Sequence, residues 1–238
     1  MINLTDKTLL ISAVQCNLDE DSFSILREHT IKNGFNVEQL NHLFKDGFQG
    51  EFIEEKHGKL LDEYLEKAHE NGIAVVVYFC LHELFESDKI EHPEWLQKDR
   101  KGDFIGAYGS HYLACLNSPW REYSKRRIKE LCRHDIDGIF LDGPFFAVNG
   151  CFCESCREEY KKAKGKDYLS ADFGEFLRFR TDRLTEFVKE LRDCVDEVKK
   201  GAPMYLNNSA LRADVIGSNT RRLAPYVDLI CAEGGFSS

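Results

Sequence analysis

Two short apolar runs, IAVVVYFC at 73–80 and DGIFLD at 137–142, constrain the fold more than any other feature of this sequence. An unbroken β-branched and aromatic character is typical of a strand that is buried on both faces. Segments with helical spacing of apolar residues separate these runs from other short apolar runs. We therefore predict strands at 9–14, 37–44, 73–80, 137–142, 203–208 and 227–232, and helices at 22–32, 58–70, 119–134, 173–199 and 219–224. Residues 82–118 are expected to form a long loop.

This alternation predicts parallel strands joined by crossover helices, which either a doubly wound sheet or a (β/α)8 barrel can satisfy. No G-x-G-x-x-G motif follows the first strand, so the sequence does not favour the dinucleotide-binding form of the doubly wound sheet. We therefore predict an α/β fold of the (β/α)8 TIM-barrel type. About six β/α units are visible, so we expect one domain over residues 1–238 that is truncated before strands seven and eight.

The charge and the apolar pattern argue against two classes of partner. The net charge is -9, whereas a nucleic-acid-binding surface normally requires a basic stripe. No apolar run approaches the roughly 20 residues that a membrane span requires. The first six residues do not resemble a signal peptide, and three of the nine cysteines crowd into one short segment. The expectation is a cytoplasmic protein with reduced thiols, which binds neither nucleic acid nor membrane.

A cluster of cysteines follows the fourth predicted strand. Cys151, Cys153 and Cys156 have the spacing C-x-C-x-x-C, which allows one turn of backbone to aim three sulfurs at a single point. A closed structural zinc site has four ligands in a tetrahedron, and Cys115 is the candidate for the fourth because its loop should lie on the same rim. Incidental cysteines or a redox pair are the alternatives, but the spacing favours structural zinc.

Several segments resemble a known enzyme family. The stretches HPEWLQKDRKG, LACLNSPWREY, DGIFLDG and CFCESCREEY resemble glycoside hydrolase family 42, the zinc-containing β-galactosidases. The sequence is even more similar to a related group of hypothetical glycosyl hydrolases, in which a strand of the form DGIFxDGP leads into a similar cysteine loop. The resemblance is good over residues 92–160 and weaker elsewhere. It implies a TIM barrel, a carbohydrate substrate, and a structural zinc held by Cys115, Cys151, Cys153 and Cys156.

The sequence departs from family 42 at the catalytic position. The family carries an Asn-Glu pair at the end of its fourth strand, and that glutamate is the acid/base. Here Asp142 is followed by Gly143 and Pro144, and the strand that carries the family's nucleophile is not recognisable. Galactosidase activity is therefore not carried over from the resemblance.

Two carboxylates at predicted strand ends are the candidates for catalysis. Glycoside hydrolysis usually requires a pair of carboxyl groups on either side of the scissile bond. Asp142 ends the fourth strand and Glu233 ends the sixth, and active sites of barrels lie at this rim. By analogy with retaining α-galactosidase-type barrels, Asp142 is expected to act as nucleophile and Glu233 as acid/base. The alternatives are a turn-stabilising role for Asp142 and a chance position for Glu233.

Other polar residues at the predicted strand ends are candidates for binding the sugar. These are Lys45, His82, Asn207 and Asn208, although the two asparagines alternate along a strand and only one can face the barrel interior. Trp95 and Trp120 could stack on sugar rings or pack loops onto the barrel. The leading prediction is a glycoside hydrolase. Because related enzymes are often oligomers, we also expect a homo-oligomer. A non-catalytic carbohydrate-binding barrel and a different hydrolase on the same fold remain alternatives.

Overall fold

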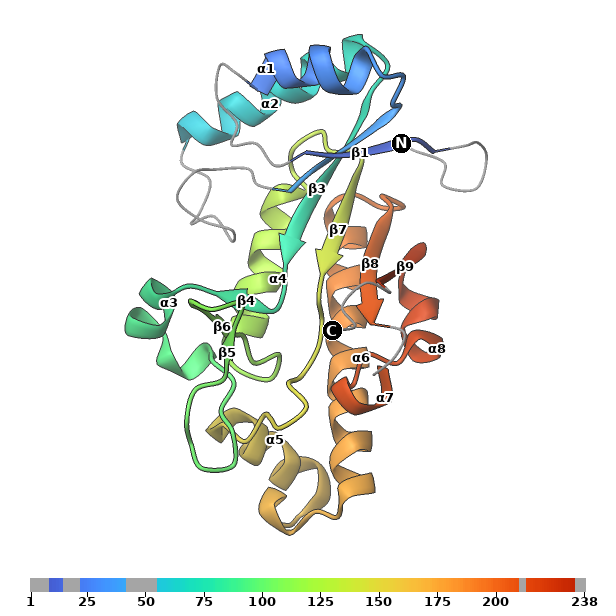
Figure 1. The fold of residues 1–238 in the computed structure, drawn as a ribbon. Helices are drawn as coiled ribbons and strands as arrows, with labels where there is room; N and C mark the ends of the chain where they lie inside the picture. Colours follow the sequence, from blue (N-terminus) through green and yellow to red (C-terminus); the bar gives the residue numbers. More distant parts are fainter. Residues whose placement is uncertain (1–8, 15–21, 42–54, 210–212, 234–238) are drawn as a thin grey trace. The chain divides into compact units, whose positions relative to one another are not determined.

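A computed structural model describes residues 9–14, 22–41, 55–209 and 213–233 (Figure 1). Its main feature is a six-stranded sheet with the order β1-β2-β3-β7-β8-β9. The bounds are β1 Ile11–Val14, β2 Val37–Leu40, β3 Ala74–Cys80, β7 Gly138–Asp142, β8 Met204–Ser209 and β9 Leu229–Glu233. All six predicted strands are therefore confirmed, with ends that shift by a few residues.

The strand order decides between the two architectures that the sequence left open. Each of the six strands lies beside the next one along the chain, and the pairs β1–β2 and β2–β3 are parallel. A doubly wound sheet reverses its strand order at a switch point, whereas a barrel adds its strands in sequence. The fold is thus α/β with the strand order of six consecutive β/α units of a TIM barrel.

The helices follow the predicted alternation, with additions around the cysteines. The described α-helices are α1 Ser22–Ile25, α2 Glu55–Glu70, α3 Glu86–Glu91, α4 Trp120–Leu131, α5 Glu154–Lys164, α6 Phe173–Val198, α7 Ala213–Ile216 and α8 Thr220–Leu223. A π-helical segment, Leu26–Ile31, continues α1. The sequence analysis did not predict α3, α5 or α7. None of the described helices combines the length and apolar character needed to cross a bilayer.

The chain forms two compact units, each assembled from three separate segments. Unit 1 comprises Met1–Cys80, Arg127–Leu141 and Asp193–Tyr205, and unit 2 comprises Leu81–Arg126, Asp142–Arg192 and Leu206–Ser238. In unit 1, α2 packs against β3, and buried side chains such as Leu61, Leu65 and Val75 form the core. This packing explains the apolar side chains on the face of β3 that α2 covers.

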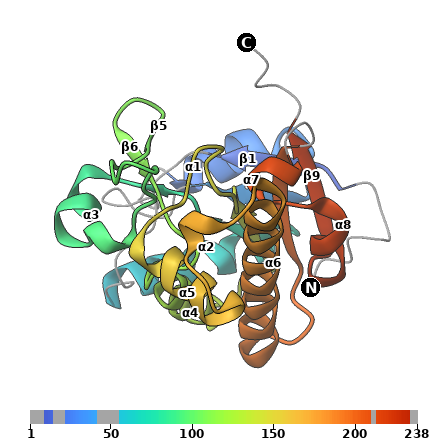
Figure 2. The same cartoon turned by 90° about the horizontal axis from the view of Figure 1, so that it is seen from below.

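Unit 2 contains structure where a loop was expected. Within residues 82–118, the short strands β4 Glu83–Leu84, β5 Gly106–Ala107 and β6 His111–Leu113 form an antiparallel sheet with the order β4-β6-β5. Helix α3 packs against β6, and both views of the fold show α3 beside this small sheet (Figures 1 and 2). Strands of two or three residues are too short to leave a periodic pattern in the sequence.

Candidate functional site

The carboxyl end of β7 carries a polar cluster in unit 2. Asp142, the last residue of β7, is partly exposed, and its Oδ1 accepts a hydrogen bond from Nδ2 of Asn207 in β8. The Asn207 amide is itself oriented, because its Oδ1 accepts a hydrogen bond from the Gly143 backbone N–H at 2.7 Å. The buried amide thus holds the carboxylate in one position while leaving it partly open to solvent.

His82 closes one side of this cluster. Its side chain is buried, and Nδ1 lies 3.3 Å from the Asp142 carbonyl oxygen, which can only accept a hydrogen bond. The ring lies so close to Gly143 that a Cβ at that position would come within 2.2 Å of Nδ1. Gly143 also has φ +60°, a conformation that favours glycine. The residue after Asp142 is therefore fixed as glycine by both the turn and the histidine.

The two adjacent asparagines of β8 do different things. Asn208 donates from Nδ2 to the Ser218 carbonyl oxygen at 2.7 Å and to Thr220 Oγ1 at 2.8 Å. Its neighbour Asn207 bonds to Asp142 instead, as expected for successive side chains on opposite faces of a strand. The structure thus places Asn207 beside the candidate carboxylate and Asn208 in contacts that fasten the chain around α8.

The structure does not describe the side chains of the two remaining residues predicted at strand ends. Glu233 is the last residue of β9, and its side chain lies outside the described part of the structure. Lys45 also lies outside the described residues.

The two tryptophans are buried: Trp120 donates from Nε1 to the Leu81 carbonyl oxygen, and its ring packs against Trp95. They pack the interior of unit 2, so neither is an exposed platform for a sugar.

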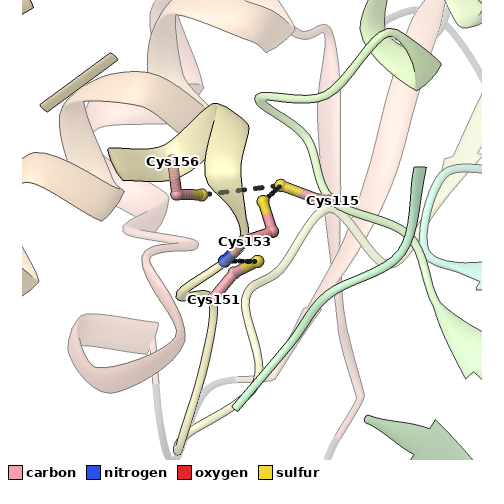
Figure 3. Close-up of side chains that lie close together, drawn as sticks. All are labelled: Cys115, Cys151, Cys153 and Cys156. Atoms are coloured by element: carbon pink, nitrogen blue, oxygen red, sulfur yellow. Dashed lines mark hydrogen bonds between the residues drawn. The ribbon is translucent and has the colours of Figure 1, made fainter. Parts of the chain in front are cut away.

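The four predicted cysteines meet in one buried cluster (Figure 3). Their Sγ atoms lie within 4.8 Å of one another, with separations of 3.5 Å for Cys115–Cys156 and 3.4 Å for Cys115–Cys153. Zinc with Zn–S bonds of about 2.3 Å would place neighbouring sulfurs roughly 3.8 Å apart in a tetrahedron. The sulfur separations and the all-thiol donor set therefore fit a metal such as zinc.

Backbone and side-chain N–H groups point at these sulfurs. The N–H of Lys98 and that of Cys153 each donate to Cys151 Sγ at 3.5 Å, and Asn117 Nδ2 donates to Cys156 Sγ at 3.2 Å. Hydrogen bonds of this kind stabilise thiolates and orient metal ligands. The cluster thus has a surrounding shell suited to deprotonated cysteines.

The surroundings of the cluster shift the pKa values of its thiols in different directions. Burial raises the pKa of the Cys115 thiol well above its usual range, and burial does the same for the pKa of Cys156. Hydrogen bonding with Cys115 and with the other two cysteines lowers the pKa of Cys153. Four buried thiolates would repel one another, and a bound cation would offset that repulsion.

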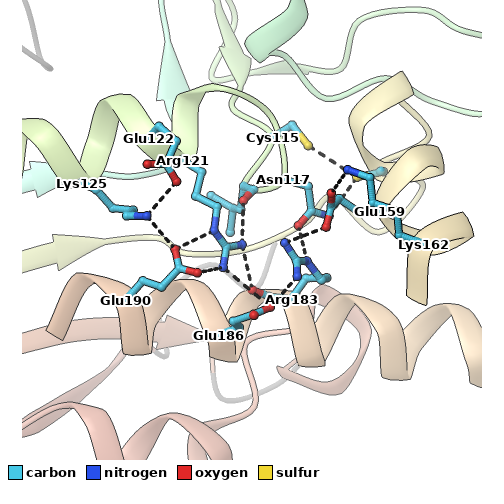
Figure 4. A network of polar contacts seen from close by, with 12 residues as sticks. Cys115, Asn117, Arg121, Glu122, Lys125, Glu159, Lys162, Arg183, Glu186 and Glu190 are labelled. Atoms are coloured by element: carbon cyan, nitrogen blue, oxygen red, sulfur yellow. Dashed lines mark hydrogen bonds and ion pairs between the residues drawn. The ribbon is translucent and has the colours of Figure 1, made fainter. Parts of the chain in front are cut away.

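A network of ion pairs connects the cysteine cluster to α4, α5 and α6 within unit 2 (Figure 4). Asn117, which donates to Cys156, also accepts from Arg183 Nε at 3.1 Å. Arg183 in turn pairs with Glu159 of α5 at 3.1 Å. Nearby, the buried Arg121 of α4 forms a two-point hydrogen bond with Glu190 of α6, at 2.9 Å for each contact. The helices around the cluster are therefore held together by partly buried charge pairs.

Sequence reasoning missed two features near the carboxyl end of β7. His111 of β6 contacts the buried carboxylate of Glu83 in β4 through Nδ1, which joins two strands of the small sheet. Tyr108, in the turn between β5 and β6, is 67% exposed and has φ +48°. A Tyr-Gly pair between short apolar segments is only a weak indication of a turn. Because residues 82–118 are predicted as one long loop, the sequence analysis does not predict a turn between two strands here.

Comparison with known proteins finds a family model over part of this chain and solved glycosidases that are similar in fold. Residues 42–143 match the family model described as hypothetical glycosyl hydrolase 6. Comparison with curated proteins finds no match in sequence. Among solved structures, a β-galactosidase from Bacillus circulans sp. alkalophilus matches with a TM-score of 0.71 and 17% identity, over 100% of this chain and 42% of the other.

Two further solved structures give the same result. A β-galactosidase from the psychrophilic Marinomonas ef1 matches with a TM-score of 0.68 and 18% identity, over 94% of this chain and 40% of that protein. An α-L-fucosidase isoenzyme 2 from Paenibacillus thiaminolyticus matches with a TM-score of 0.60 and 22% identity, over 88% of this chain and 34% of its own. The chain thus spans less than half the length of these proteins, and at such identities the likeness shows a shared fold.

Proposed function

Residues 42–143 match the hypothetical glycosyl hydrolase 6 family, and from that premise we propose that this protein hydrolyses an O-glycosidic bond in a carbohydrate, with Asp142 as a catalytic carboxylate. The observation that carries the proposal is the position of Asp142. It is partly exposed at the carboxyl end of a buried strand, and a buried asparagine holds its carboxylate. Catalytic residues of barrel enzymes come from this end of the strands.

The proposed chemistry is a double displacement. An oxygen of Asp142 attacks the anomeric carbon as the bond from that carbon to the leaving oxygen breaks, and Glu233 gives its proton to the leaving oxygen. Water then attacks the same carbon, returns a proton to Glu233 and releases Asp142. Asn207 supports the nucleophile because its N–H donates to the charged carboxylate and fixes its direction. The outcome would be retention of anomeric configuration.

The metal has a structural role in this proposal. Cys115, Cys151, Cys153 and Cys156 would hold zinc, and a site with four thiolate ligands leaves no open position for water or substrate. The metal would therefore fix the loop after β7 and the start of α5 without taking part in hydrolysis. Since the cluster requires reduced thiols, we also propose that the protein functions in a reducing compartment such as the cytoplasm.

The experiment that tests the proposal is hydrolysis of a panel of aryl glycosides by the full-length protein and two variants. Asp142→Asn should lower kcat on the preferred glycoside by about 10³-fold or more, because the nucleophile is lost. Asp137→Asn, at the other end of the same strand, is the matched control and should retain activity. Azide should partly restore turnover in Asp142→Gly, since it can occupy the space of the missing carboxylate and attack in its place.

The alternatives give different results. If no glycoside is cleaved but sugars still bind, the non-catalytic carbohydrate-binding barrel replaces the enzyme; the Gly143 that follows Asp142, where family 42 has its catalytic glutamate, favours this second function. If Asp142→Asn retains full turnover, the assignment of Asp142 is wrong.

A further inference from the structure

Buried arginines in the described part of the chain differ in how their charge is matched. Arg121, in α4, pairs with the carboxylate of Glu190 at 2.9 Å. Arg127, also in α4, pairs with the carboxylate of Glu130. Arg180, in α6, is 1% exposed and forms no ion pair with a carboxylate of the described residues. Since an unpaired buried charge costs much free energy, the charge of Arg180 requires a partner of another kind.

The groups in direct contact with the Arg180 guanidinium leave its charge uncompensated. Its Cζ lies 5.4 Å from the ring centroid of Phe146 and 4.8 Å from that of Phe176. Nη2 donates to the carbonyl oxygen of Ala147, whereas Nε and Nη1 are buried without a hydrogen-bond partner. Two aromatic rings and one carbonyl dipole stabilise a cation, but they carry no negative charge of their own.

The Ala147 carbonyl connects Arg180 to the cysteine loop. The same oxygen accepts a hydrogen bond from the Gly150 backbone N–H at 3.1 Å. Gly150 directly precedes Cys151, the first cysteine of the C-x-C-x-x-C segment. Arg180 and all four cysteines of the cluster belong to unit 2. The arginine is therefore attached to the turn that leads into the cluster.

A second connection runs through an aromatic ring. Phe176, which contacts the guanidinium, stacks on Phe152 of the C-x-C-x-x-C segment, with ring centroids 5.2 Å apart. Burial lowers the pKa of Arg180 to about 10, and Cys156 and Cys151 are among the groups whose negative charge opposes that shift. The guanidinium thus stays charged at neutral pH and lies within electrostatic reach of the sulfurs.

The proposed metal site has a charge that matches this arginine. Four thiolates carry twice the charge of the zinc ion that they bind, so the complete site is a buried anion. We propose that Arg180 is the counter-cation of this metal–thiolate cluster. It offsets the excess negative charge through space, without a hydrogen bond to a sulfur. This inference rests on the proposed zinc site and is independent of the proposed catalytic carboxylates.

The test measures the zinc affinity of the full-length protein by competition with a chromogenic chelator. Arg180→Gln removes the charge but retains an N–H donor for the Ala147 carbonyl, and it should lower the zinc affinity by about 10-fold or more. Arg180→Lys retains the charge without the planar guanidinium and should keep the affinity within about 3-fold of the wild type. The absorption spectrum of bound cobalt(II), which reports tetrahedral thiolate coordination, should keep its shape in both variants. If Arg180→Gln does not fold, Arg180→Met takes its place.

Arg178→Gln is the matched control, because it removes an exposed charge from the same helix and should leave the zinc affinity unchanged. A wild-type affinity in Arg180→Gln would overturn the inference. Equal losses in Arg180→Gln and Arg180→Lys would also overturn it, because the shape of the side chain and not its charge would then be responsible. A wild type that binds no metal would overturn both this inference and the zinc proposal. The expected order of affinities in a protein that cleaves no glycoside would support this inference while the glycosidase proposal fails.

Discussion

The two ends of β7 each have an aspartate, and the two carboxylates have opposite surroundings. Asp137, directly before the strand, accepts from the Val75 backbone N–H and from His69 Nε2, both at 2.8 Å, and its side chain is 13% exposed. Asp142, at the other end, is held by the side chain of Asn207 and is followed by the left-handed Gly143. The first carboxylate fastens backbone and a helix, whereas the second is oriented by a side chain.

This difference corresponds to the division of roles in barrel folds. Residues at the amino ends of the strands contribute to stability, and those at the carboxyl ends contribute to chemistry. The same residue type, at two positions five residues apart at opposite ends of one short strand, is therefore expected to give two different phenotypes when it is changed. The following predictions test this division, in order of decreasing effect.

The largest effect is expected from the cysteine cluster, which we propose is structural although it follows the carboxyl end of β7. Cys151→Ser should abolish stoichiometric metal content and lower Tm by roughly 10 °C or more, because metal binding contributes directly to folding. Elemental analysis and thermal unfolding measure the two quantities. Cys194→Ser is the control, since this buried cysteine lies in α6 outside the cluster. Full metal content in Cys151→Ser would remove that cysteine from the ligand set.

Replacement of Asp137 should have the next largest effect on stability. Asp137→Ala leaves the Val75 N–H without its carboxylate acceptor, and such a loss costs about 1–3 kcal/mol in free energy of unfolding. Chemical denaturation measures this cost, and kcat of the folded protein should remain close to that of the wild type. A loss of turnover comparable to that of Asp142→Asn, at normal stability, would break the proposed division between the two ends.

The smallest effect is expected for His69, the second partner of Asp137. Its side chain is 31% exposed, and exposed ion pairs contribute about 0–1 kcal/mol. His69→Gln should therefore lower the free energy of unfolding by less than about 1 kcal/mol, because glutamine can still donate a hydrogen bond. A cost as large as that of Asp137→Ala would mean that the histidine, and not the Val75 N–H, is the important partner.

The parts of this molecule that the sequence predicted depend on local patterns. The strand at 73–80 could be predicted because its apolar run is unbroken. Seven of its residues form β3, and most of these are buried on both faces of the strand. The set of four cysteines was also predictable, since three lie within six positions and the family resemblance pointed to the fourth. Helix α5 was missed because only Cys156 and Tyr160 are buried on an otherwise charged segment, which leaves too narrow an apolar stripe.

The candidate active site depends on contacts that no local pattern reveals. Asn207 was expected to compete with Asn208 for the same role, and only the fold distinguishes the one that meets Asp142. The close approach of His82 to Gly143 joins residues about 60 positions apart, as does the contact between His82 and the Asp142 carbonyl.

The cysteine cluster also has a consequence for how this protein is made. Cys115 and Cys156 are 41 residues apart, so Cys115 meets the other three cysteines only when a long loop closes. During synthesis, the ribosome releases Cys115 well before the C-x-C-x-x-C segment, and the complete ligand set forms only after both have emerged. With zinc bound as proposed, the yield of folded protein would therefore follow the supply of zinc and the reducing power available to nascent chains.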